Sequence, residues 1–341
     1  MTIRVLIIDD STVMQGVLTA LIELQTDLKV VGTANDAFEA REQIKLLKPD
    51  VVTLDVEMPK MDGITFLEKL MRLHPMPVVM VSSLTLKNAD VTLRALELGA
   101  IDFITKPQIA DRSELTEFAA ALCEKLRTAA NTAPRFMRPA IPLSRLAEKT
   151  FRPSAVIAIG ASTGGTEAIR EILERFPANA PPIVIAQHMP EMYTQSFAKR
   201  LNDLCAITVF EASHGQILKQ GHAYIAPGGK HLRIRRLGRQ LETVVDETEK
   251  INRHRPSVDA LFHSVAETVG ADAVGVLLTG MGNDGAEGLG AMHRTGAFTI
   301  AQDEQSCVVF GMPKVAIEAG YVDCVASIKG VAGKVLEVVQ M

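Results

Sequence analysis

The first 127 residues alternate short apolar runs with amphipathic stretches, and this alternation constrains the fold more than any other feature. Each apolar run has the length and the β-branched content of a strand, whereas each amphipathic stretch repeats its apolar residues at helical spacing. Strands separated by helices pair in parallel, because the helix carries the chain back to the end of the sheet where the strand began. We therefore predict a doubly wound α/β domain with five parallel strands, at residues 5–8, 29–32, 51–54, 78–81 and 102–105.

Polar side chains that could hold a metal ion and a phosphoryl group stand at the carboxyl ends of these strands. Asp9 and Asp10 follow the first strand, Asp55 the third, Ser82 the fourth and Lys106 the fifth. Such side chains meet at one edge of a parallel sheet. Three carboxylates there repel one another, so we predict a divalent cation among them, with Mg²⁺ as the expected ion. A hydroxyl and an ammonium beside this site suit transfer of a phosphoryl group to and from a carboxylate.

Residues 3–122 resemble a response-regulator receiver domain, which has a flavodoxin-like five-stranded parallel sheet. The resemblance includes the strand-end residues above and the run Asp55-x-x-Met58-Pro59-x-Met61-Asp62-Gly63. It implies that Asp55 accepts a phosphoryl group from the histidine kinase CheA. It also implies Mg²⁺ ligands from Asp10, Asp55 and the backbone carbonyl of Glu57, support of the phosphorylation site by Asp9, Asp10, Ser82 and Lys106, and a cis peptide bond before Pro107.

A glycine-rich turn organises the second half of the chain. The turn Gly160-Ala-Ser162-Thr-Gly-Gly165 lies between an apolar strand-like run and a helix-like stretch. A serine at such a turn projects beside backbone N–H groups and the positive end of a helix, which suits a nucleophile that creates an oxyanion. The alternative is a phosphate-binding loop. A dinucleotide fold would end its next strand in an acidic residue, where this chain has Gln187-His188, so we favour the nucleophile.

Two further polar residues follow predicted strands of this half. His188 follows the strand at residues 183–186, and Asp284 follows the strand at 273–278 by a few residues. If these strands are parallel, both residues join Ser162 at one edge, and the three groups are those of a charge-stabilised hydroxyl nucleophile. A capping histidine and a turn aspartate are the alternatives for each residue taken alone. The order Ser, His, Asp differs from that of α/β-hydrolases. At residues 207–245 we expect an antiparallel excursion with a hairpin turn at 227–230.

Residues 152–341 resemble the catalytic domain of the CheB family of chemotaxis methylesterases. The matching runs are Gly160–Gly165, Gln187–Pro190, Ala226–His231 and Leu278–Gly285. The resemblance implies that Ser162, His188 and Asp284 form a catalytic triad and that the backbone amide of Met281 contributes to the oxyanion hole. It also implies three parts: a receiver domain at residues 3–122, a linker at 123–151, and a second doubly wound, mostly parallel α/β domain at 152–341.

The reaction that this family implies is hydrolysis of glutamate γ-methyl esters on chemoreceptors, which releases methanol and serves chemotactic adaptation. Deamidation of receptor glutamines is implied as well. The unphosphorylated receiver would obstruct access to Ser162, and phosphorylation of Asp55 would relieve the obstruction. The ester chemistry itself would need no cofactor. Two alternatives stay open, an esterase or amidase for a small soluble substrate and a non-enzymatic signalling scaffold.

Composition limits the partners and the compartment. The chain has 36 Lys and Arg against 40 Asp and Glu, so it lacks the basic excess of a nucleic-acid-binding module. Its apolar runs are shorter than the roughly 18 residues of a membrane span, and residues 1–4 lead into a strand rather than a signal peptide. We therefore expect a cytoplasmic protein without a nucleic-acid partner or membrane insertion. Because its cysteines form no CxxC pair, we expect free thiols at Cys123, Cys205, Cys307 and Cys324.

Overall fold

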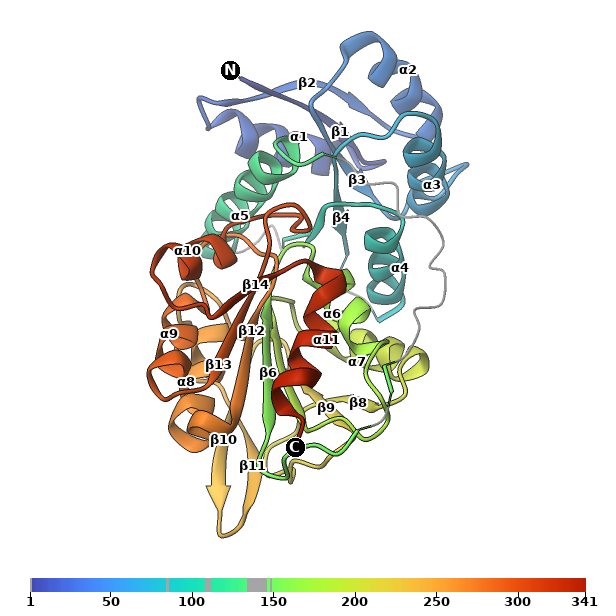
Figure 1. Cartoon of the computed structure of the whole chain (residues 1–341). Coiled ribbons are helices and arrows are strands. Elements are labelled where there is room, and N and C mark those ends of the chain that lie inside the picture. The colour runs from blue at the N-terminus through green and yellow to red at the C-terminus, as the bar shows by residue number, and fades with distance from the viewer. Residues whose placement is uncertain (1, 84–85, 108–111, 134–145, 148) are drawn as a thin grey trace. The chain divides into compact units, whose positions relative to one another are not determined.

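The structure is a computed structural model of the 341-residue chain. It describes residues 2–83, 86–107, 112–133, 146–147 and 149–341. The chain divides into two compact units, Met1–Ala140 and Ile141–Met341, and each is described by itself. Figure 1 shows the helices and strands in chain order. Within the described ranges, no helix combines the length and the apolar character that crossing a membrane requires. The four cysteines are not joined in disulfides.

The first unit is a parallel sheet with helices on both faces, as the sequence predicts. Its strands are β1 (Ile3–Ile8), β2 (Leu28–Ala34), β3 (Val51–Asp55), β4 (Val78–Ser82) and β5 (Asp102–Thr105), and its helices are α1 (Thr12–Glu23), α2 (Ala37–Leu47), α3 (Gly63–Leu73), α4 (Leu86–Glu97) and α5 (Arg112–Ala130). The strand order is β2-β1-β3-β4-β5, and all neighbours pair in parallel. Helices α1 and α5 pack on one face, and α2, α3 and α4 cover the other (Figure 1).

Side-chain caps start three of the helices that follow strands of this sheet. Ser11, Asp36 and Asp62 each accept a backbone N–H from the first turn of the following helix through a side-chain oxygen. Ser11 comes immediately after Asp9 and Asp10, so the chain turns from β1 into α1 within a few residues. The two carboxylates therefore stay at the carboxyl edge of the sheet.

The last helix of the first unit extends beyond the predicted end of the receiver domain at residue 122. Helix α5 continues to Ala130, past residue 122, because its apolar residues keep facing the core through Leu126 and Ala129. The domain boundaries at residues 122 and 152 stay a prediction, and residues 134–145 and 148 of the predicted linker lie outside the described residues. The cis peptide bond in the described part of the chain precedes Pro256, so the expectation of a cis bond before Pro107 is wrong.

The second unit is built on a seven-stranded sheet whose strands all pair in parallel. Its strands and helices are β6 (Val156–Ala161), α6 (Gly165–Leu173), β7 (Ile183–Gln187), α7 (Tyr193–Leu204), β8 (Thr208–Glu211), β9 (His222–Ile225), β10 (His231–Leu237), β11 (Gln240–Asp246), α8 (Val258–Thr268), the 3-10 helix η1 (Gly270–Asp272), β12 (Ala273–Leu277), α9 (Ala286–Arg294), β13 (Phe298–Gln302), α10 (Met312–Glu318), β14 (Cys324–Ala326) and α11 (Ile328–Val339). The strand order is β14-β13-β12-β6-β7-β9-β8.

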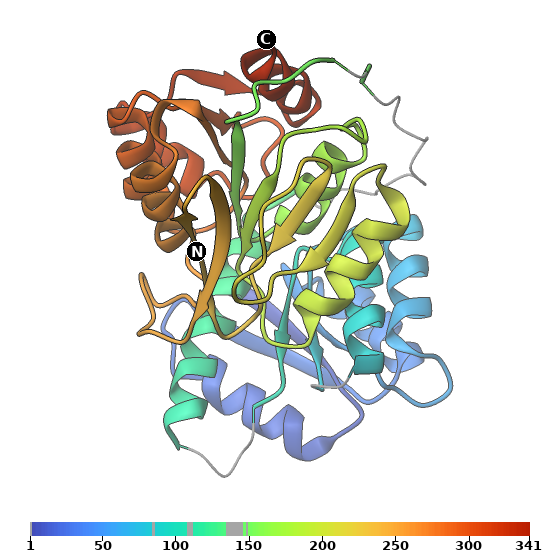
Figure 2. The ribbon, with the colours of Figure 1, turned by 90° about the horizontal axis from the view of Figure 1, so that it is seen from below.

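This order reverses between β6 and β12. The chain first adds strands on the β7 side of β6 and later, from β12 onward, on the other side. Helices α6, α7 and α11 pack on one face of the sheet, and α8, α9 and α10 pack on the other (Figure 2). At such a reversal the flanking helices diverge and leave a crevice at the carboxyl ends of the strands, which is where open α/β sheets bind ligands.

The antiparallel part of this unit is smaller than the sequence suggested. Strands β8 and β9 join the parallel sheet beside β7, and only β10 and β11 pair antiparallel, as a separate two-stranded sheet against α8. The hairpin turn expected at residues 227–230 is therefore wrong. Gly228 lies against the backbone of Pro190 and Glu191, and a Cβ added to it would lie only 2.3 Å from the backbone nitrogen of Glu191. This contact directs the chain away from β9, so β9 and β10 do not pair.

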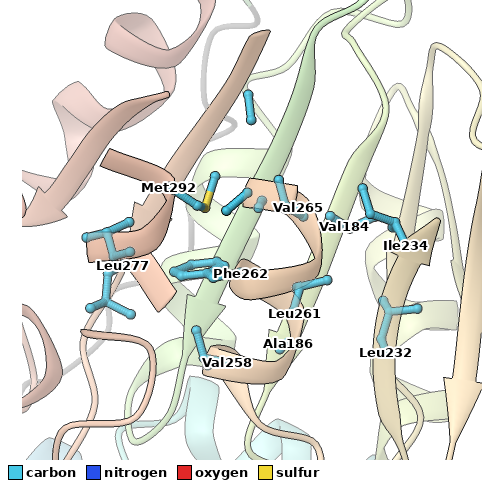
Figure 3. Packing of buried hydrophobic residues seen from close by; sticks show 14 of the residues in the cluster. Val184, Ala186, Leu232, Ile234, Val258, Leu261, Phe262, Val265, Leu277 and Met292 are labelled. Atoms are coloured by element: carbon cyan, nitrogen blue, oxygen red, sulfur yellow. The ribbon is translucent and has the colours of Figure 1, made fainter. Parts of the chain in front are cut away.

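Phe262 is at the centre of the core between α8 and the sheet (Figure 3). Because its ring is fully buried, we expect Phe262→Ala to lower the free energy of unfolding of the second unit by about 3–5 kcal/mol. Urea titration of the full chain measures this change. Leu237→Ala, at a side chain that is 54% exposed in the same unit, is the matched control, with an expected change of about 0.5 kcal/mol or less. Equal losses for both variants would contradict this assignment of the core.

Candidate active site and phosphorylation site

Ser162 follows β6 directly and lies at the carboxyl edge of the second sheet. Its backbone N–H donates to the carbonyl of Thr279 at 3.0 Å, and its carbonyl accepts from the N–H of Gly165 at 2.7 Å. Gly164 has φ +77°, and an added Cβ there would lie 2.5 Å from Val308, so the turn requires glycine. These contacts place Ser162 beside the N-terminus of α6, whose partial positive charge favours a developing oxyanion.

The structure brings together Ser162 and His188, which directly follow β6 and β7, and Asp284, which lies in the loop after β12. His188 Nδ1 lies 3.1 Å from Ser162 Oγ, and His188 Nε2 lies 2.7 Å from Asp284 Oδ2. A proton on Nε2 can be donated to the carboxylate, which leaves Nδ1 free to accept from the serine hydroxyl. A general base needs this tautomer, because its lone pair must face the proton that it removes.

Asp284 is buried and accepts hydrogen bonds on both oxygens. Oδ1 accepts from Ser257 Oγ at 2.8 Å and from Asn252 Nδ2 at 2.9 Å, while Oδ2 accepts from the N–H of Val258 at 2.7 Å. Burial acts to raise the pKa of Asp284, but the bonds from His188, Asn252 and Val258 outweigh it and hold that pKa far below its usual range. The carboxylate therefore stabilises the fold at every pH above the pKa of an unfolded aspartate, about 3.9, and the contribution is lost progressively below it.

Close packing of α8 on the sheet brings its N-terminus to the carboxylate. An added Cβ on Gly160 of β6 would lie 2.1 Å from Val258 Cγ1, so only a glycine lets the first turn of α8 approach this closely. Ser257 caps this helix and also donates its hydroxyl proton to Asp284. The positive end of α8 thus faces the negative charge of Asp284, which is the favourable orientation.

Met281 lies in the loop between β12 and α9, next to the Ser162 turn. The loop is held in place because the carbonyl of Gly280 accepts from the N–H groups of Gly311 and Met312, at 3.1 and 2.9 Å. The hydroxyl of Thr279 also donates to the carbonyl of Thr163 at 3.0 Å. The contribution of Met281 to an oxyanion hole stays a prediction.

The predicted phosphorylation site also assembles, in the first unit. Asp9 and Asp55 are buried, and both bind Lys106, whose Nζ lies 2.8 Å from Asp9 Oδ2 and 2.7 Å from Asp55 Oδ2. Burial raises the pKa of Asp55 to about 6, against the lowering effect of Lys106. Ser82 is fully buried at the end of β4, and the N–H of Lys106 donates to its carbonyl at 2.8 Å. Four of the predicted site residues therefore lie at the carboxyl edge of this sheet.

The donor set at this edge fits a hard divalent cation. Asp9, Asp10 and Asp55 each offer a carboxylate oxygen, and these oxygens lie within 4.8 Å of one another, with Asp10 exposed and the other two buried. Oxygen-only sites of this kind suit Mg²⁺, which retains several water ligands. The backbone carbonyl of Glu57 stays the predicted further ligand.

Comparison with known families covers both units. A family model described as CheB methylesterase matches residues 157–335, and a model described as response regulator receiver domain matches residues 5–119. The chain belongs to the CheB methylesterase family. It joins a receiver domain of five parallel strands to a parallel-sheet methylesterase domain, so the predicted fold class is confirmed.

Similar proteins extend over nearly the whole chain. A Salmonella typhi protein named protein-glutamate methylesterase/protein-glutamine glutaminase is 54% identical over 98% of this chain and 96% of its own length. A Bordetella bronchiseptica protein of the same name has the same identity and the same coverage. The crystal structure of the Thermotoga maritima CheB methylesterase catalytic domain covers 54% of this chain and 98% of that chain, with 41% identity and a TM-score of 0.53. The prediction of an ester hydrolase is confirmed.

Sequence reasoning missed two side chains at the candidate active site of this CheB-family enzyme. The sequence patterns do not single out His254, yet its ring stacks on His188 with centroids 3.7 Å apart and an interplanar angle of 11°. Asn252 was not considered at all, although it donates to Asp284. The one local signal is Pro256-Ser257, which predicts a helix start but not where that helix points.

Proposed function

We propose that the chain is a phosphorylation-activated protein-glutamate methylesterase that acts in the cytoplasm on methylated chemoreceptors. It hydrolyses glutamate γ-methyl esters to free carboxylates and methanol, and it deamidates receptor glutamines by the same route. The observation that carries the proposal is the hydrogen-bonded chain from Ser162 through His188 to Asp284 at the topological reversal of the sheet. The names of the Salmonella and Bordetella relatives support glutamate esters and glutamines as the substrate groups.

In the acylation step, Ser162 Oγ attacks the γ-carbonyl carbon while His188 Nδ1 takes the hydroxyl proton. The negative charge that forms on the carbonyl oxygen is stabilised by backbone N–H groups at the start of α6 and by the amide of Met281. The resulting imidazolium still donates its Nε2 proton to Asp284 in a hydrogen bond, and the negative carboxylate stabilises the positive ring. Collapse of the intermediate breaks the bond to the methoxy group, and His188 gives it the proton, so methanol leaves.

Deacylation repeats the sequence with water. His188 removes a proton from a water molecule that attacks the acyl-enzyme, and it then returns a proton to Ser162 Oγ. The products are a glutamate carboxylate and the free serine. With a glutamine side chain the leaving group is ammonia instead of methanol, and every other step is the same. One site therefore suffices for both activities.

The receiver domain is the regulatory part of this proposal. The histidine kinase CheA is the phosphodonor, and Asp55 is the acceptor. Mg²⁺ held by Asp10, Asp55 and the Glu57 carbonyl would neutralise charge on the phosphoryl oxygens. Lys106 already pairs with Asp55, and a phosphoryl group there offers the ammonium a second, more highly charged partner. A tenfold activation of the esterase corresponds to about 1.4 kcal/mol of coupling between the two units.

Methanol release from methylated receptor membranes, with and without acetyl phosphate and Mg²⁺, tests the proposal. We expect the phosphodonor to stimulate release by the parent chain about tenfold or more. The Asp55→Asn variant should lose this stimulation, because the amide cannot form the acyl phosphate. Glu42→Gln is the matched control: it changes the same charge on an exposed α2 side chain and should respond like the parent.

Each other outcome rejects a stated part of the proposal. Release that ignores the phosphodonor would reject the regulatory role of Asp55 but keep the esterase. Hydrolysis of short-chain esters without any release from receptors would indicate an esterase for a small soluble substrate. The absence of both activities, together with no labelling of Ser162 by a fluorophosphonate, would indicate a scaffold.

A further inference from the structure

The turn formed by Ile251, Asn252, Arg253 and His254 (the 251–254 turn) contacts two members of the triad at once. Two backbone hydrogen bonds close it: Ile251 N–H donates to His254 O at 3.1 Å, and His254 N–H donates to Ile251 O at 2.9 Å. Asn252 and Arg253 have φ values of 52° and 69°, in the left-handed region that non-glycine residues rarely adopt. A tight, closed turn of this kind holds the side chains that it carries in fixed directions.

His254 fixes one face of the His188 ring. The two imidazoles are nearly parallel, with centroids 3.7 Å apart and an interplanar angle of 11°. The hydrogen bonds of His188 to Ser162 and Asp284 lie at the edges of its ring, and they leave the ring free to rock about the axis that joins them. A ring stacked on the face opposes this rocking, because tilting would drive His188 into its neighbour. The stack therefore keeps Nδ1 aimed at the serine hydroxyl.

Asn252 fixes the other end of the triad. Its Nδ2 lies 2.9 Å from Asp284 Oδ1 and 2.6 Å from Asp259 Oδ2, so both amide protons are used. Asp259 in the first turn of α8 and Asp284, which faces the start of that helix, are both buried carboxylates, and their charges repel. The amide group between them satisfies an oxygen of each and holds the two apart. Asparagine is also one of the few residues that accepts the left-handed backbone at this position.

We propose that the 251–254 turn is a positioning device for the general base, in which His254 holds the plane of the His188 ring and Asn252 holds the carboxylate that orients it. The inference rests on the proposed function, because it assigns His188 and Asp284 the roles given there. His254 and Asn252 are positioning residues: they act on the reaction through His188 and Asp284. Stacking, and not the acid–base chemistry of His254, is the property that the proposal requires.

This requirement separates two substitutions at one site. We expect His254→Ala to lower kcat for methanol release from methylated receptors by about tenfold or more, with little change in KM, because the base loses its orientation while substrate contacts remain. His254→Phe keeps a flat ring and should retain kcat within about threefold. The rate at which a fluorophosphonate labels Ser162 in the full chain gives a second readout without receptors, and it should follow the same order.

His222→Ala is the matched control for His254→Ala. His222 also contacts an aromatic ring, Phe210, but it begins β9 at the opposite, amino edge of the sheet. This variant should keep the parent labelling rate. For Asn252 the informative variant is Asn252→Gly, which accepts the backbone of the turn and removes only the amide. We expect it to slow labelling of Ser162 by about tenfold or more.

The possible results separate this inference from the proposed function. If Ser162→Ala abolishes methanol release and His254→Ala behaves like the parent, the triad stands and the positioning role is wrong. Equal losses in His254→Ala and His254→Phe would also overturn it, because a ring would then not be sufficient. If Ser162→Ala releases methanol normally, the proposed function itself fails. Thermal unfolding of each variant identifies any loss of rate that comes from a misfolded chain. For such a variant, the labelling rate of Ser162 per folded molecule is compared with that of the parent chain, and a normal rate contradicts the positioning role.

Discussion

The Ser162→Ala variant is expected to release methanol from methylated receptor membranes about 10⁶-fold more slowly than the parent chain, with the phosphodonor present. The reason is that, in the proposed mechanism, the ester bond is broken through a covalent intermediate on Ser162 Oγ. His188 lies 3.1 Å from that atom and, without it, has no protein nucleophile to activate. Residual catalysis would come from backbone N–H groups near the turn acting on a water attack.

This variant should fold like the parent. The hydroxyl of Ser162 bonds His188 at the partly exposed edge of the sheet, and the backbone bonds of the turn do not need it. The measurement is a time course of methanol release together with mass spectrometry of fluorophosphonate-treated protein. Ser213→Ala, at an exposed serine of the same unit, is the control and should keep both the activity and the label. Release from Ser162→Ala within about a hundredfold of the parent would exclude the acyl-enzyme route.

The Asp284→Asn variant is expected to lower kcat by about 10⁴ while methanol release remains measurable. The carboxylate accepts bonds from Asn252, Ser257, Val258 and His188, and it donates none. An amide has one acceptor oxygen and one NH₂ group, so one of these two positions becomes a donor. With the NH₂ toward His188, Nε2 must accept, the ring proton moves to Nδ1, and the base can no longer take the proton of Ser162.

A loss of this kind should appear in kcat and in the labelling rate of Ser162, with a smaller effect on KM. Asp323→Asn is the matched control, since Asp323 also accepts backbone and hydroxyl bonds, from Thr299, but on β13 and away from the triad. Thermal unfolding separates the chemical effect from destabilisation by unpaired donors around residue 284. If Asp284→Asn retained more than about a tenth of the parent kcat, the orienting role of the carboxylate would be wrong.

The strand-end residues were predictable because of a simple geometric rule. In a parallel sheet every strand ends at the same edge, so a polar residue just after a strand is placed before any packing is known. This rule brought Asp9, Asp55 and Lys106 together in one unit and Ser162 and His188 in the other. Asp284 was harder, since it lies several residues beyond β12, and its position depends on the N–H groups of α8 that hold it.

The prediction of an antiparallel segment within residues 207–245 is confirmed for β10 and β11, but β8 and β9 were wrongly included in it, because local patterns do not encode pairing partners. Short β-branched runs with a glycine-containing turn between them look alike whether the two strands pair or separate. Here the packing of Gly228 against the Pro190 backbone decided the outcome, and that contact joins segments far apart in the chain. Strands β8 and β9 consequently extend the parallel sheet, and only β10 and β11 form a hairpin.

The sequence by itself determined the two α/β units, the edge of each sheet that carries the polar groups, and the residue types of both sites. These features follow from periodicity and strand direction, which are properties of short segments. The tertiary structure alone decided which imidazole nitrogen faces Ser162, that His254 stacks on His188, and that Asn252 lies between two carboxylates. These contacts join segments that lie far apart in the chain. Their geometry therefore depends on how α8 packs on the sheet, and no pattern within a single segment predicts it.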